Sequence, residues 1–81
     1  MKVRVVAYAR IRDVVGASTL EREVGDGATA GDVLAKLSAE FPLLADLARS
    51  IRFVRDGAFV TEATAVRDGD ELGLLPPYGG G

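Results

Sequence analysis

The residues best suited to chemistry in this sequence form its last stretch, PPYGGG, at positions 76–81. Pro76 and Pro77 fix φ and favour an extended polyproline conformation, so they should project the chain away from the residues before them. The glycines at 79–81 carry no side chain, and an extended backbone of this kind can thread a channel too narrow for other residues. The reactive group is the α-carboxylate of Gly81, which is a weak electrophile until it is activated, for example by adenylation. The pattern therefore predicts a tail that presents a carboxylate for activation.

Composition excludes several kinds of site elsewhere in the chain. No cysteine or histidine occurs among the 81 residues, which excludes disulfides, thiolate or imidazole metal ligands, and Cys or His nucleophiles. Asp68, Asp70 and Glu71 cluster, but a DG turn explains them better than a hard cation, which needs six or more oxygen ligands. We therefore predict no metal site and no cofactor bound by this chain.

Charge and hydropathy limit the classes of partner. The net charge is −2 and no run of Lys or Arg occurs, so we expect no nucleic acid partner. The apolar stretches are far too short to span a bilayer, and the first residues lack the long apolar segment of a secretory signal. We therefore expect no membrane contact and a cytoplasmic location. Because 48% of the residues are hydrophobic, a single domain with an apolar core is expected.

Local patterns predict a series of strands around one main helix. Thr29 has the character of an N-cap, with Asp32 three residues later as in a capping box. Apolar residues then recur at helical spacing as far as Phe41, and Pro42 ends or kinks this helix. Alternating or β-branched stretches predict strands at 2–9, 19–24, 51–55, 58–60 and 71–75. Short turn or helical pieces are expected after the first strand and over 43–49.

The order of these elements indicates the architecture. One helix in the middle of the chain must cover one face of a small sheet. The first and last strands are the most hydrophobic, so they should lie side by side in its centre. We therefore predict an α+β fold of the β-grasp (ubiquitin-like) type, with a mixed sheet covered by one main helix. Residues 1–75 would form this domain, and residues 76–81 a flexible reactive tail that ends in Gly-Gly.

Three stretches carry a resemblance to a known family, namely YARIRDVVG (8–16), DGDELGLLPP (68–77) and the final GG. With them, the whole chain resembles the small subunit of molybdopterin synthase, a ubiquitin-like sulfur carrier. Asp13 stands where the family usually has Glu. The family tail usually reads Pro-Pro-Val-Ser-Gly-Gly; here Tyr78 and Gly79 occupy its middle positions, and the tail length is kept. Without this combination, a glycine-rich end would be interpreted as a loose terminus.

The resemblance implies a chemical cycle at Gly81. In the family, an adenylating enzyme uses ATP to activate the terminal glycine, and sulfur then replaces the adenylate to give a thiocarboxylate. The tail, in which Gly80 precedes the reacting residue, inserts into the large synthase subunit, where the sulfur passes to a pterin precursor. The expected partners are thus the large subunit of molybdopterin synthase and an ATP-dependent adenylating enzyme. Two small and two large subunits would form a heterotetramer, and the chain alone would not be an enzyme.

Strand alternation and the same resemblance predict the surface that contacts the partner. Tyr8 and Leu75 fall on the faces of their strands opposite to the expected core residues, and Phe59 is expected to join them. Apolar side chains exposed together are typical of a docking surface. Arg12 could steady the tail or contact a partner carboxylate, or it could be a solvated surface arginine. The predicted partner-binding set is Tyr8, Arg12, Phe59, Leu75, Pro76, Pro77, Tyr78 and Gly79.

Other functions are compatible with the same pattern. A related sulfur carrier could serve cysteine, thiamin, tRNA thiolation or a thio natural product, although the Pro-Pro pair favours molybdopterin. A ubiquitin-like modifier would instead join its terminus to lysines of target proteins. A plain interaction module would have an inert tail and would tolerate deletion of Gly81.

Overall fold

The strands and the main helix predicted from the sequence are present over residues 1–76, which the computed structural model describes. In chain order the elements are β1 (Lys2–Ala7), α1 (Ala9–Val15), β2 (Thr19–Glu23), α2 (Ala30–Glu40), α3 (Pro42–Ala45), the 3-10 helix η1 (Ala48–Ser50), β3 (Arg52–Arg55), β4 (Ala58–Val60) and β5 (Glu71–Leu75). Of the predicted tail, only Pro76 lies within the described residues; positions 77–81 lie outside them.

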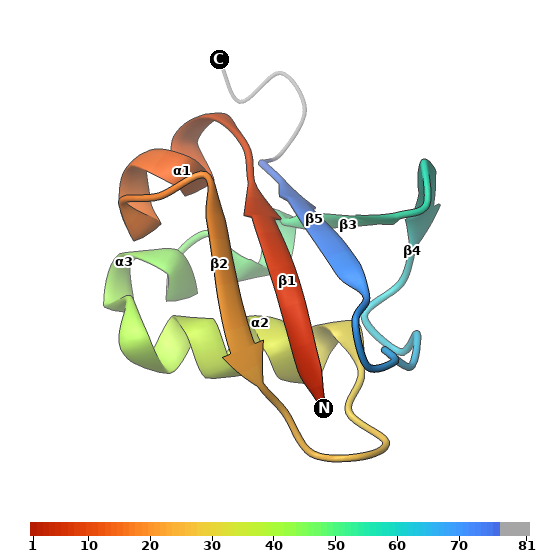
Figure 1. The fold of residues 1–81 in the computed structure, drawn as a ribbon. Helices are drawn as coiled ribbons and strands as arrows, with labels where there is room; N and C mark the ends of the chain where they lie inside the picture. Colours follow the sequence, from red (N-terminus) through yellow and green to blue (C-terminus); the bar gives the residue numbers. More distant parts are fainter. Residues whose placement is uncertain (77–81) are drawn as a thin grey trace.

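The strands form one five-stranded sheet in the order β2-β1-β5-β3-β4. β1 and β5 run parallel, with a register from Arg4 opposite Glu71 to Ala7 opposite Leu74. The other neighbouring pairs are antiparallel. The prediction that the first and last strands lie side by side within the sheet is confirmed. A mixed sheet of this order, with one helix crossing it, is the predicted β-grasp fold (Figure 1).

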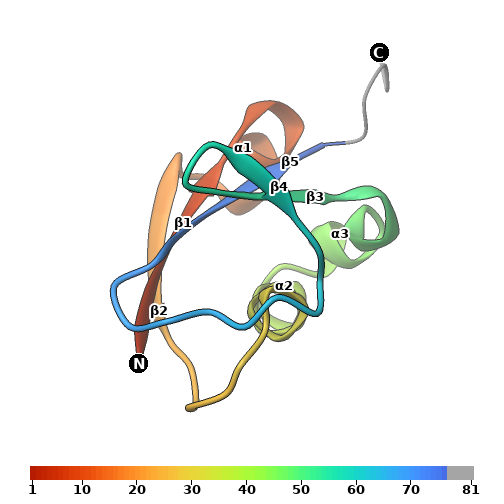
Figure 2. The same cartoon turned by 90° about the vertical axis from the view of Figure 1, so that its right-hand side faces the viewer.

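The core lies between this sheet and α2, which crosses one of its faces (Figures 1 and 2). The side chains that meet there are fully buried and aliphatic, and they include Val3, Val5, Val33, Leu37, Leu72 and Leu74. Each Val or Leu buried in this way contributes about 1.5–3 kcal/mol relative to an exposed one. The core therefore supplies the stability that a chain without cysteine cannot take from disulfides. Over residues 1–76, no helix is both long and apolar enough to cross a membrane.

The ends of α2 follow the predicted signals. The Asp32 amide donates a hydrogen bond to the Thr29 hydroxyl at 3.2 Å, and the Thr29 amide donates to the Asp32 carboxylate at 2.9 Å. This reciprocal capping box satisfies two amides that the helix cannot pair internally. At the other end Phe41 caps the helix, and Pro42 occupies the first position of α3. Pro42 has no amide hydrogen, so it ends one helix and begins the next.

The first strand is shorter than predicted. It ends at Ala7 rather than Ala9, and Ala9 instead begins α1 with a φ of 50°. Ala9 is consequently exposed and does not lie on the core face. A positive φ at alanine costs about 1–2 kcal/mol, and the turn that requires it brings Ile11 and Val15 into the core. Burial of these two side chains offsets the strain, so packing rather than strand propensity sets the end of β1.

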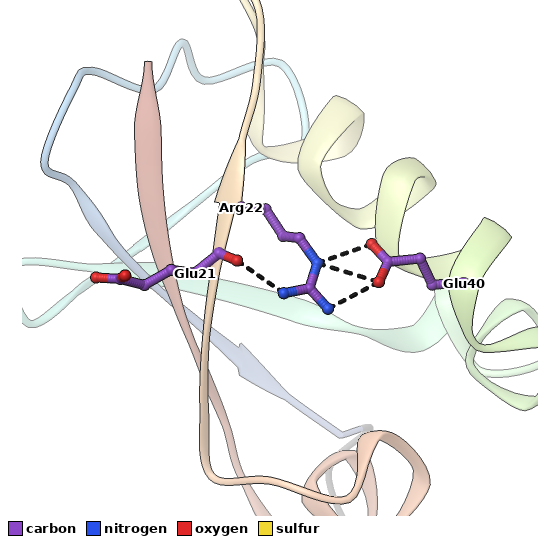
Figure 3. A network of polar contacts seen from close by, with 3 residues as sticks. All are labelled: Glu21, Arg22 and Glu40. Carbon is purple, nitrogen blue, oxygen red and sulfur yellow. Dashed lines mark hydrogen bonds and ion pairs between the residues drawn. The ribbon is translucent and has the colours of Figure 1, made fainter.

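An ion pair joins the edge strand β2 to α2. Arg22 points inward from β2, and its Nε and Nη2 donate hydrogen bonds of 2.7–3.1 Å to the Glu40 carboxylate (Figure 3). Its Nη1 donates to the Glu21 carbonyl at 2.7 Å. The hydrogen bonds from Arg22 lower the pKa of Glu40 below its ordinary value. An inward-facing charge of this kind also discourages other strands from pairing with an exposed sheet edge.

Candidate partner surface at the root of the tail

The tail leaves the domain from the centre of the sheet. β5 is flanked by β1 and β3, and it ends at Leu75 directly opposite Arg52 of β3. On the other side, the Tyr8 amide donates a hydrogen bond to the Leu74 carbonyl at 3.3 Å. Leu75 and Pro76 are half-buried. The backbone is thus held on both sides as far as the last residues before 77–81.

An apolar row crosses the face of the sheet that α2 does not cover. The strand register places Val6, Gly73, Val54 and Phe59 in line across β1, β5, β3 and β4. Val6 and Val54 are half-buried, whereas the Phe59 side chain is 65% exposed. Because the four strands hold this row in register, its side chains present one continuous apolar surface.

Tyr8 covers the middle of this row. A Cβ at position 73 would lie only 3.2 Å from Cε2 of Tyr8, so the tyrosine ring rests directly on the Gly73 backbone. Gly73 is buried as a result, although it faces away from the core. The absence of a side chain at Gly73 is what allows the ring to approach the strand. Tyr8 remains 45% exposed, so the ring both shields the strand and stays accessible to a partner.

Arg52 stands beside Phe59 on the same face. Its Cζ lies 5.4 Å from the centroid of the Phe59 ring, within the range of a cation–π interaction. Arg52 also lies opposite Leu75, the last residue of β5. The root of the tail therefore has an apolar surface on one side and a positive charge next to it.

Most of the predicted partner-binding residues of 1–76 are accessible. Tyr8 and Phe59 are exposed as expected, and Leu75 and Pro76 are half-buried at the root of the tail. Arg12 is exposed on α1 and makes no side-chain hydrogen bond within residues 1–76, so its role stays a prediction. Predictions at Pro77, Tyr78, Gly79, Gly80 and Gly81 lie outside the described residues.

Gly73, Val54 and Arg52 of this surface were not predicted from the sequence. Strand alternation cannot show which residues of β3 and β5 stand beside Tyr8, because that depends on register. A glycine inside the predicted last strand was the available signal, since it often marks the close approach of another group.

The acidic cluster before β5 is used within the fold. The Asp68 carboxylate accepts a hydrogen bond from the Lys2 amide at 2.7 Å. The Asp70 carboxylate accepts from the Arg67 amide at 2.8 Å and from the Arg55 guanidinium at 3.3 Å. These contacts tie the turn at Gly69 to β1 and β3, in agreement with its interpretation as a turn. In the part of the chain that the structure describes, no three acidic residues are grouped as a metal would need.

The ThiS family model matches residues 5–81, which is nearly the whole chain. The chain belongs to the ThiS family. The predicted resemblance to the ubiquitin-like sulfur carriers is thereby confirmed. Positions 77–81 fall inside the match, so the tail is part of the family pattern in sequence.

Individual relatives match along all or most of their lengths. The molybdopterin synthase sulfur carrier subunit of Chlamydomonas reinhardtii is 34% identical, with all of both chains covered. Small archaeal modifier protein 3 of Haloferax volcanii is also 34% identical over all of both chains. Among solved structures, the Haloferax volcanii HVO 2177 protein in solution has a TM-score of 0.88 at 34% identity, covering 100% of this chain and 87% of that one. The similar proteins thus include both a sulfur carrier subunit and a small archaeal modifier protein.

Proposed function

We propose that this chain is the sulfur carrier subunit of a molybdopterin synthase and that Gly81 carries the sulfur. The observation that most supports this is the position of the tail root. β5 brings Pro76 out of the centre of the sheet, where Tyr8 is exposed next to β5 and Phe59 is exposed on β4, beyond β3. The full-length similarity to a molybdopterin synthase sulfur carrier subunit adds support from sequence.

The proposed chemistry takes place on the Gly81 carboxylate. A carboxylate oxygen attacks the α-phosphorus of ATP in an adenylating enzyme, and pyrophosphate leaves. A sulfide-level sulfur nucleophile from a donor protein then attacks the acyl carbon. The bond between this carbon and the bridging phosphate oxygen breaks, and AMP leaves with that oxygen. The resulting thiocarboxylate gives its sulfur to a pterin precursor, and water restores the carboxylate. In this scheme the partner proteins supply the acids and bases, and the chain supplies the acyl group.

The proposed docking surface consists of Tyr8, Phe59 and Leu75, with Pro76 at the point where the tail departs. Aromatic residues are favoured in the cores of protein interfaces because they bury much area at a low entropic cost. The large synthase subunit would cover this surface while residues 77–81 enter its active site. A heterotetramer of two small and two large subunits is the proposed assembly.

A second candidate function is attachment to other proteins. It is favoured by the 34% identity to small archaeal modifier protein 3, which equals the identity to the sulfur carrier subunit. The same acyl-adenylate would then be attacked by a lysine amine instead of a sulfur nucleophile, and an isopeptide bond would replace the thiocarboxylate. A carrier that serves cysteine, thiamin, tRNA thiolation or a thio natural product would differ only in the protein that receives the sulfur.

The test is the intact mass of the chain after incubation with the adenylating enzyme of its host, ATP and a sulfur donor. The full chain should gain the mass difference between sulfur and oxygen, and a variant that lacks Gly81 should not. Addition of the large subunit and the pterin precursor should then return the original mass. An unchanged mass with a competent activating enzyme would contradict the sulfur-carrier function. Lysine conjugates in place of the mass gain would support the second candidate.

A further inference from the structure

The arginines of this chain fall into two groups by their partners. Arg4, Arg22 and Arg55 each lie within 3.4 Å of a carboxylate, on Glu71, Glu40 and Asp70 respectively. Within residues 1–76, the remaining arginines are exposed and have no carboxylate within salt-bridge distance; they are Arg10, Arg12, Arg49, Arg52 and Arg67. An exposed guanidinium without an internal partner is available to pair with a group on another molecule.

All of these unpaired arginines except Arg67 lie at the end of the sheet where the tail departs. Arg52 is opposite Leu75, and Arg49 belongs to η1 immediately before β3. Arg10 and Arg12 belong to α1, which follows the β1 residue paired with Leu74. Since β1 and β3 flank β5, the positive charges stand on two sides of the tail root. Figure 1 shows α1 beside the upper end of β5, far from the N-terminus at the other end of the sheet.

The opposite end of the sheet carries charges of both signs. Glu23, Asp70 and Glu71 are paired there with the amino terminus of Met1, with Arg55 and with Arg4, respectively. The chain as a whole has a net charge of −2. The unpaired arginines at the tail end are therefore a local feature of the fold. They do not reflect a generally basic chain, which is what a nucleic-acid-binding protein would have.

The best-defined part of this positive region is the hollow between η1, β3 and β4. It has a volume of about 550 Å³, and its lining includes Arg49, Arg52, Phe59 and Thr61. The Phe59 ring holds the Arg52 guanidinium without neutralising it. Glu62 also lines the hollow, but it forms no ion pair with either arginine. A planar guanidinium fixed on an aromatic ring is well suited to bind a carboxylate with two parallel hydrogen bonds.

We propose that Arg10, Arg12, Arg49 and Arg52 form an arginine collar that pairs with aspartate and glutamate side chains around the entrance to the partner's tail channel. This inference rests on the proposed function, because it assigns charge to the surface of the protein that accepts the tail. Carboxylates at such an entrance would attract the arginines at the tail end of the domain. The collar would thus orient the domain before the tail enters, and it would act mainly on the association rate.

The test compares charge reversals at the two ends of the sheet. The chain carrying both Arg49→Glu and Arg52→Glu should associate with the large synthase subunit at least about ten-fold more slowly than the wild type at low salt. Arg67→Glu is the control, because it reverses an exposed, unpaired arginine at the opposite end of the sheet. Association rates would be measured by stopped-flow fluorescence at several salt concentrations, with thermal unfolding as a check on the fold. The deficit should shrink in about 1 M salt, where the Debye length is about 3 Å.

Arg52→Lys separates charge from shape at the same position. It keeps the positive charge but loses the planar stacking on Phe59, so its association rate should stay close to that of the wild type. A loss as large as that caused by the combined Arg49→Glu and Arg52→Glu substitutions would overturn the collar as an electrostatic device. Equal rates for the Arg49/Arg52 variant and the Arg67 variant, or a deficit that does not depend on salt, would overturn it as well. So would collar-dependent binding of single-stranded RNA with no change in the protein association rate.

The same samples separate the collar from the proposed function. If the wild type gains sulfur and binds the large subunit while the collar variants associate equally fast, the collar inference fails and the proposed function stands. If the wild type binds neither the large subunit nor the adenylating enzyme, the proposed function fails. The proposed pairing of the collar with carboxylates of the large subunit then fails as well.

Discussion

Phe53 and Phe59 stand on neighbouring strands but on opposite faces of the sheet. Phe53 lies against the core and is 5% exposed, whereas Phe59 lies on the open face and is 65% exposed. The same contrast holds between β1 and the residue that follows it, since Val5 is fully buried and Tyr8 is 45% exposed. One face of the sheet thus stabilises the fold, and the other presents apolar area that the fold does not need. Exposed area of this kind is what a partner can bury.

The two phenylalanines should differ most in how much each contributes to the stability of the fold. Phe53→Ala should lower the free energy of unfolding by about 3–5 kcal/mol, because it leaves a cavity in the core. Phe59→Ala should cost no more than about 1 kcal/mol, since it removes only exposed area and the contact with Arg52. Urea denaturation of the two variants measures both values. Similar losses at both positions would show that the open face also supports the fold.

The next effect should appear in binding rather than in stability. Tyr8→Ala and Phe59→Ala should each weaken the affinity for the large synthase subunit about ten-fold or more, as expected of central aromatic residues in an interface. Leu43→Ala is a matched control, because Leu43 is 67% exposed on α3, away from this face. Isothermal titration calorimetry would give the three dissociation constants. An equal loss at Leu43 would indicate that general hydrophobicity, and not this face, governs binding.

A smaller effect is expected from a change beneath the Tyr8 ring. Gly73→Ala places a methyl group 3.2 Å from Cε2 of Tyr8 and 3.6 Å from Cβ of Val54, so the ring must shift by a few tenths of an ångström. We expect a loss of about 1 kcal/mol in stability and a changed NMR signal from the Tyr8 ring.

The double variant Tyr8→Ala/Gly73→Ala tests the cause. If the ring contact is responsible, the methyl group should cost little once the ring is absent, and the two changes should not be additive. Additive losses would mean that the methyl group disturbs the strand itself.

The smallest effect concerns the ion pair between the edge strand and α2. Hydrogen bonding to Arg22 lowers the pKa of Glu40 from its ordinary value of 4.5, so the ionised form is favoured in the folded chain. The stability from this pair is therefore present above about pH 4.5 and is lost as the pH falls through the lowered pKa. The difference in stability between the wild type and Glu40→Gln should be visible at pH 7 and should vanish in acid. Unfolding curves that stay equally far apart from pH 7 to pH 2 would contradict this.

Predictions from local patterns were the most accurate at the ends of α2. Thr29, Asp32 and Pro42 act through atoms a few residues away, so the capping box and the helix end follow from sequence spacing alone. The end of β1 was predicted wrongly for the opposite reason. Burial of Ile11 by α1, a tertiary effect, overrides the strand pattern that continues to Ala9.

The order of the elements, their alternating faces and the family can be inferred from the residues alone, because they depend on residue types at short, regular spacings. The residues that stand beside one another across strands become known only from the folded chain. The register of β5 between β1 and β3 places Gly73 under Tyr8 and Leu75 opposite Arg52. It also collects arginines from α1, η1 and β3 at one end of the sheet. Contacts between residues far apart in the chain depend on the packing of the whole core, and no local pattern encodes them.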